Sequence, residues 1–214
     1  MSTKEWSILA VAVVIFTILC FIELPKLIHS LLYCLVVLVP ALYICKGNYS
    51  LFFKKPRLKD IKTIILCFLG YFIYGMIINS ILTHIGYTTV GDTNSALATN
   101  LMFFVGLFIQ LIGEEFFKIL ILLIVMYLVF KKTNNRSTAI YTGIFTTLII
   151  FGLAHMEAYS GRILQIVFIQ GFGTIFNLYA YMKTKNMVVS YLVHILIDVS
   201  SFSTVVFSHI AHMC

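Results

Sequence analysis

Long apolar runs separated by short polar connections fill most of the sequence. A run of about 20 apolar residues is needed to cross a hydrocarbon core about 30 Å thick, and several runs approach or exceed that length. The pattern predicts seven membrane-spanning helices, at residues 6–22, 27–45, 63–83, 101–130, 138–160, 163–182 and 187–207. The fourth run is long enough for one strongly tilted helix or for two joined pieces, which would make eight.

The composition supports the same conclusion. Of 214 residues, 61% are hydrophobic and only 11% are charged, which lies far outside the range of soluble globular domains. We therefore expect an all-α, polytopic membrane helix bundle that forms a single integral membrane domain over residues 1–214, with a motif-bearing core at about 101–207. The first run has no small-residue cleavage site after it, so we expect a retained helix and not a signal peptide.

Basic residues indicate the orientation of the bundle. With the seven predicted helices, twelve of the fifteen Lys and Arg residues fall in segments on one side of the membrane, six of them between residues 46 and 62. The positive-inside rule then places the N-terminus in the cytoplasm and the C-terminus outside, and we expect the plasma membrane of a prokaryotic cell. The net charge of +7 therefore needs no nucleic-acid partner, because these side chains can contact anionic membrane lipid.

Ionisable residues inside the apolar runs are the main chemical signal. An acid or base at the centre of a membrane helix costs about 2.5–3.5 kcal/mol on insertion scales, so such groups normally face the bundle interior and contact one another. They occur in three of the predicted helices: Glu114, Glu115 and Lys118, then His155 and Glu157, and finally His194 and Asp198. This clustering predicts a polar cavity between those helices.

Helical spacing predicts how some of these side chains are oriented. Glu114 and Lys118 are four residues apart and share a helix face, whereas Glu115 is turned away by about 100°. In straight helices with the predicted bounds, His155 lies toward the outer membrane face and His194 toward the inner one, with a depth difference of roughly 10 Å. Tilted or broken helices would be needed to bring the two histidines together.

Each polar residue also has a purely structural interpretation. Either glutamate could form an ion pair with Lys118 that only stabilises the fold. A single histidine in a membrane helix more often forms an interhelical hydrogen bond than a catalytic contact, and Glu157 could be interfacial, since it lies near the end of its run. Only the joint occurrence of carboxylates and histidines aimed at one cavity favours catalysis.

Most hydrolytic site types are missing from the sequence. No His-Glu-x-x-His zinc motif is present, the five cysteines are scattered without metal-binding spacing, and there is no Gly-x-Ser-x-Gly or Gly-x-Gly-Asp stretch. What remains is a carboxylate that works with histidine on a water molecule. We therefore expect no metal and no cofactor.

Three short motifs resemble those of a known family. The stretches "EEFFK", "FGLAH" and "HILID" are similar to the three motifs of the CPBP (ABI) superfamily of intramembrane glutamate proteases. That superfamily includes type II CAAX prenyl endopeptidases, bacteriocin-processing and self-immunity proteins and, more distantly, PrsW-type proteases that cut anti-sigma factors. The CAAX-type first motif is Glu-Glu-x-x-x-Arg, but this chain has Ile119 there and Lys118 as the basic residue. That spacing, like Glu157 after the second motif, is PrsW-like.

The resemblance implies a role for each motif residue. Glu114 would be the general base that deprotonates water, and Glu115 would support it. His155 would bind and orient that water. His194, with Asp198 where many relatives have Asn, would stabilise the oxyanion of the tetrahedral intermediate.

The resemblance also implies the activity. Lys118, Phe151 and Glu157 would support a metal-independent glutamic endopeptidase. Its substrate would be a peptide or a membrane-anchored protein, of the CAAX-like, bacteriocin- or signal-peptide-processing, or anti-sigma-factor type. Two alternatives remain open: a non-catalytic membrane scaffold or immunity protein of the same fold, and a proton-coupled transporter.

Overall fold

Helices form nearly all of the protein in the computed structural model, which describes the backbone of residues 2–93 and 101–213 and the side chains as far as residue 202. No strand occurs in these described ranges. The longer helices are α1 (Thr3–Leu19), α2 (Lys26–Cys45), α3 (Leu58–His84), α4 (Leu101–Thr133), α5 (Arg136–Leu153), α7 (Ile175–Thr184) and α8 (Met187–Met213). The short elements are η1 (Tyr49–Leu51), α6 (Ile163–Gln165) and the π-helical η3 (Ile166–Gly171).

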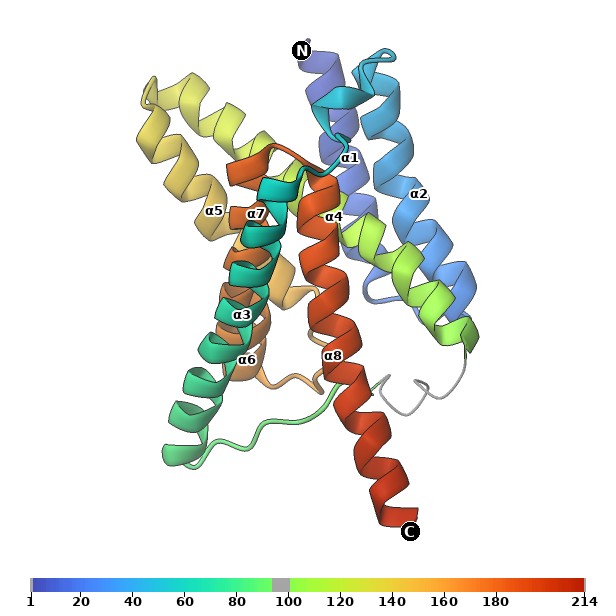
Figure 1. Ribbon diagram of the computed structural model, residues 1–214. Coiled ribbons are helices and arrows are strands. Elements are labelled where there is room, and N and C mark those ends of the chain that lie inside the picture. Colours follow the sequence, from blue (N-terminus) through green and yellow to red (C-terminus); the bar gives the residue numbers. More distant parts are fainter. Residues whose placement is uncertain (1, 94–100, 214) are drawn as a thin grey trace.

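Every predicted apolar run corresponds to helix, so the all-α membrane bundle is confirmed. The fourth run is one helix, α4, of 33 residues, and it crosses the bundle at a steep tilt (Figure 1). The sixth run is α6, η3 and α7 in continuous succession. Within the described residues, four helical stretches are long and apolar enough to cross a membrane by length and composition: Lys26–Cys45, Leu58–His84, Arg136–Leu153 and Ile163–Thr184. The number of spans therefore stays a prediction.

The fifth run ends earlier than the sequence predicts. Helix was expected to residue 160, but α5 ends at Leu153 and residues 154–161 form successive turns. Gly152 explains the tight return of the chain, because a Cβ there would lie 2.8 Å from the carbonyl oxygen of Ile166. Ser160 and Gly161 then adopt left-handed backbone conformations, with φ of 50° and 69°. Tertiary contact with the following segment overrides the apolar pattern here.

The connections that carry the basic residues lie toward one end of the bundle. The N-terminus and the α2–α3, α4–α5 and α7–α8 connections lie at one end, and the C-terminus lies at the other (Figure 1). These connections, the helix ends next to them and the N-terminal residues carry the twelve basic residues that the sequence assigns to one side. The fold thus agrees with the predicted sorting of charge, whereas the cytoplasmic location of that end stays a prediction.

Helix α4 forms the centre of the core. All of its residues from Gly113 to Leu122 are buried, and Phe117 stacks on Phe16 of α1 with ring centroids 4.2 Å apart. Gly113 lies directly against α2, where an added Cβ would be 2.6 Å from the carbonyl oxygen of Tyr33. Because that oxygen belongs to the backbone, only glycine allows the two helices to approach so closely.

We predict that Gly113→Ala lowers the thermal stability of the purified protein in detergent. Overpacking a well-packed core costs about 1–3 kcal/mol, and the contact here is with backbone that cannot rotate away. The matched control is Gly75→Ala in α3, where nothing lies within 4 Å of an added Cβ, so its melting temperature should be unchanged or slightly higher. Equal melting temperatures for the two variants would contradict the close packing of α2 on α4.

Candidate active site

A cavity of about 560 Å³ lies inside the bundle and is lined by residues of α1, α2, α3, α4, α5, η3, α7 and α8 and of the turns after α5. It contains most of the residues singled out from the sequence. Six of the eight line it: Glu114, Phe151, His155, Glu157, His194 and Asp198. The other two, Glu115 and Lys118, are buried in the wall behind it, each with 1% of its side chain exposed.

The two histidines meet at this cavity despite the depth difference expected for straight helices. The ring centroid of Phe151 is 4.7 Å from that of His155 and 6.2 Å from that of His194. Helix α5 ends at Leu153, and His155 lies two residues later, in the turns that follow the helix. Phe151 therefore contacts both histidine rings, and both rings line the same cavity.

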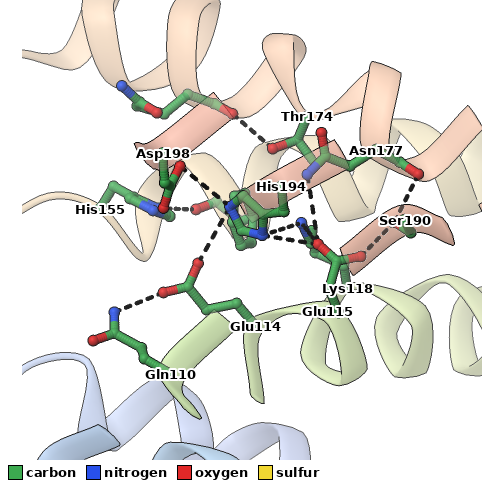
Figure 2. A network of polar contacts seen from close by, with 12 residues as sticks. Gln110, Glu114, Glu115, Lys118, His155, Thr174, Asn177, Ser190, His194 and Asp198 are labelled. Carbon is green, nitrogen blue, oxygen red and sulfur yellow. Dashed lines mark hydrogen bonds and ion pairs between the residues drawn. The ribbon is translucent and has the colours of Figure 1, made fainter. Parts of the chain in front are cut away.

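The buried ion pair of α4 joins Lys118 to Glu115 and not to Glu114. The sequence left both pairings open, since residues three and four apart are neighbours on a helix. The partners of Glu115 on other helices settle the choice. Ser190 of α8 donates a hydrogen bond to its carboxylate, and the Asn177 amide of α7 lies 3.5 Å from the other oxygen (Figure 2).

Glu115 also fixes the ring of His194. Nδ1 of His194 is 2.8 Å from Oε1 of Glu115, and a carboxylate oxygen only accepts hydrogen bonds from such a ring, so Nδ1 carries the proton. Nζ of Lys118, at 3.3 Å from the same nitrogen, is then a close neighbour and not its donor. Nε2 faces the cavity, 3.8 Å from Oε2 of Glu114 and 3.8 Å from Oδ1 of Asp198.

His155 presents the same ring nitrogen, Nε2, to the cavity. Its Nδ1 lies 2.8 Å from the carbonyl oxygen of Phe151, which can only accept, so Nδ1 donates. In the neutral ring Nε2 is then an acceptor that is available to a cavity water. The Phe151 ring also lies against the ion pair, with Nζ of Lys118 4.6 Å from its centroid.

Several contributors to the site carry no signal in the sequence analysis. Ser190 and Asn177 are buried polar residues that look unremarkable in apolar runs. Gln110 donates from Nε2 to Oε1 of Glu114 at 2.7 Å, and its spacing of four residues from Glu114 could have suggested that contact. Lys26 contacts Gln110 from a helix 84 positions earlier, which no local pattern reveals.

Comparison with known families agrees with the motifs. Residues 96–200 match the family model described as type II CAAX prenyl endopeptidase Rce1-like. This part of the chain is similar to that family. The Rce1-like region contains all three motifs, so the resemblance to the CPBP superfamily is confirmed, whereas the PrsW-like features of the first motif stay a prediction. Neither a curated protein nor a solved structure matches the chain.

The similarity to the Rce1-like family supports a CAAX-type protease fold in an integral membrane protein, with a protein or peptide as substrate. It assigns no role to individual residues of this chain. Among the described residues there is no group of three or more His, Cys, Asp or Glu side chains arranged to hold a metal ion. The expected independence from metal stays a prediction.

We predict that Lys118→Met strongly lowers the melting temperature. The change leaves the carboxylate of Glu115 buried without its cation, and breaking a buried pair from one side typically costs about 3–5 kcal/mol. The double variant Lys118→Met/Glu115→Gln removes both charges and should recover part of the loss. Thermal unfolding of the two variants and wild type in detergent measures this. A single variant as stable as wild type would mean that the ion pair does not stabilise the bundle.

Proposed function

We propose that this protein is an intramembrane glutamic endopeptidase in which Glu114 activates a water molecule to cleave a peptide or a membrane-anchored protein. The observation that supports this most is that two adjacent carboxylates have different surroundings. Glu115 is held by Lys118 and Ser190 in the wall, whereas Glu114 lines the cavity opposite the Nε2 atom of His194. A pair used only for stability would not need the second carboxylate.

The geometry accommodates a nucleophilic water. Oε2 of Glu114 and Nε2 of His194 are 3.8 Å apart, too far for a hydrogen bond. One water oxygen can lie at about 2.8 Å from both atoms, a normal hydrogen-bond distance. Glu114 would take a proton from this water as its oxygen attacks the carbonyl carbon of the scissile peptide bond, while Nε2 of His155 accepts a hydrogen bond from the remaining O–H.

The tetrahedral intermediate carries its negative charge on the former carbonyl oxygen. With Nδ1 bonded to Glu115, a doubly protonated His194 would donate from Nε2 to that oxyanion. Asp198, 3.8 Å from the same nitrogen, would hold the ring in place. As the C–N bond breaks, Glu114 returns its proton to the leaving amine, so the products are a carboxylic acid and an amine.

The surroundings fit a substrate that reaches the site from the membrane. Helices α2, α3, α5 and α7 contribute to the cavity wall, and each belongs to a stretch that is apolar enough to span a bilayer. We therefore propose a membrane-associated peptide substrate of the CAAX-like, signal-peptide-processing or anti-sigma-factor type. We further propose that the basic end of the bundle faces the cytoplasm of a prokaryotic cell and contacts anionic lipid.

We predict that Glu114→Gln leaves the protein folded and inserted but lowers turnover by at least about 10²-fold, the lower end of what a positioned general base contributes. The measurement is cleavage of a quenched fluorescent peptide that ends in a farnesylated CAAX sequence, together with new peptide termini in membranes that contain wild type or variant. Glu115→Gln is the matched control, because it should mainly lower the melting temperature by leaving Lys118 unpaired.

The alternatives give different results in the same experiment. A non-catalytic scaffold or a transporter would give identical peptide termini for wild type and Glu114→Gln. Normal cleavage by Glu114→Gln with only a lower melting temperature would make the glutamates structural. Either result would refute the protease proposal.

We also predict that cleavage of the same peptide persists in a chelator. A glutamate-activated water needs no metal, and no His-Glu-x-x-His helix is available to bind zinc. Elemental analysis of the purified protein should find less than stoichiometric zinc. One zinc per chain, with loss of cleavage on its removal and recovery on its return, would overturn the scheme.

A further inference from the structure

A chain of hydrogen bonds enters the cavity from α2 and ends on Glu114. Nζ of Lys26 donates to Oε1 of Gln110 at 2.7 Å, and Nε2 of Gln110 donates to Oε1 of Glu114 at 2.7 Å (Figure 2 shows the second contact). All three side chains line the cavity. Lys26 lies outside the region that matches the Rce1-like family, so the first helices of this chain contribute directly to its site.

The two end groups of this chain, Lys26 and Glu114, fix the orientation of the Gln110 amide. A lysine ammonium only donates and an ionised carboxylate only accepts. The amide can therefore satisfy both neighbours in one orientation alone, with its oxygen toward Lys26 and its nitrogen toward Glu114. Without the lysine, the amide could turn over and place its oxygen against the carboxylate, a repulsive contact.

Close packing of α2 on α4 brings these groups together. Gly106 precedes Gln110 by one helical turn and lies against α2, where an added Cβ would be 3.3 Å from Oγ of Ser30 and 3.6 Å from Cγ of Lys26. Gly113 follows Gln110 and touches α2 in the same way. Because positions 106, 110 and 113 share a face of α4, the two glycines hold Gln110 in the contact.

The hydrogen bond from Gln110 makes the two oxygens of Glu114 different. Oε1 accepts the amide N–H, while Oε2 has no hydrogen bond to any described residue and faces Nε2 of His194 at 3.8 Å. We propose that Lys26 and Gln110 are positioning residues that hold Oε1 so that Oε2 is the oxygen presented to water. This inference rests on the proposed function, because it assigns the orientation of the same catalytic carboxylate.

The first test needs no substrate. Dicyclohexylcarbodiimide, an apolar reagent, labels accessible membrane carboxyl groups in their protonated form, and mass spectrometry measures the rate at Glu114 in the purified full-length protein. A hydrogen bond to a charged group is strong enough to change a rate by about tenfold. We expect Gln110→Leu, which removes a hydrogen bond that stabilises the ionised carboxylate, to label about tenfold faster than wild type. Lys26→Met should change the labelling rate in the same direction by a smaller factor.

Conservative variants of Lys26 distinguish an effect of the orientation of the Gln110 amide from an effect of the positive charge. Lys26→Gln is neutral but keeps an N–H donor for Gln110, so it should recover most of the wild-type labelling rate, as should Lys26→Arg. Lys46→Met is the control, because Lys46 follows the other end of α2 and pairs with Glu5. A melting temperature within a few degrees of wild type shows that each variant is folded. Unchanged labelling in both Gln110→Leu and Lys26→Met overturns the proposal, as does Lys26→Gln behaving like Lys26→Met.

Kinetics with the farnesylated peptide give the second test. Gln110→Leu should lower kcat about tenfold with KM unchanged, because the hydrogen bond aims the base and does not hold the substrate. A raised KM with unchanged kcat in Lys26→Met would overturn the positioning role and make Lys26 a substrate-binding group. Wild-type cleavage by Glu114→Gln would instead refute the protease itself. If Glu114→Gln is inactive while Gln110→Leu and Lys26→Met cleave and label normally, only the positioning inference fails.

Discussion

The ion pair between Glu115 and Lys118 is the interaction on which the rest of the site depends. A single charge between membrane helices is strongly unfavourable, so each of these groups requires the other. Their pairing places a carboxylate where α4 meets α7 and α8, and Ser190 and His194 both bond to it. The orientation of the His194 ring, and with it the nitrogen that faces the cavity, follows from this one buried contact.

Two adjacent glutamates serve different purposes because the helix turns by about 100° between them. Glu115 points into the wall and neutralises Lys118. Glu114 points into the cavity, where its contacts are the Gln110 amide at 2.7 Å and the more distant His194 ring. A stability element and a reactive group are thus coupled through the backbone of a single helical turn, which suits the hydrolytic role proposed for Glu114.

Helices α1 and α2 lie outside the family match but not outside the site. The contact of Gly113 with the backbone of Tyr33 holds α2 against the motif-bearing helix, and the same face of α4 carries Gln110. The distance that allows Lys26 to reach that amide is therefore set by glycine packing several residues away. Under our proposal, a residue outside the family match, Lys26, helps to orient the catalytic carboxylate.

The sequence by itself determined the class of the protein, the positions of its helices and the residues of its three motifs, because apolar run length and helical periodicity are local properties. Tertiary structure alone decided that Lys118 pairs with Glu115, since Ser190 and Asn177 come from other helices. It also ended α5 at Leu153, where Gly152 lies against the backbone of the next segment, and it brought both histidines to one cavity. These outcomes depend on how closely distant backbones approach, and a linear pattern of residues does not contain that distance.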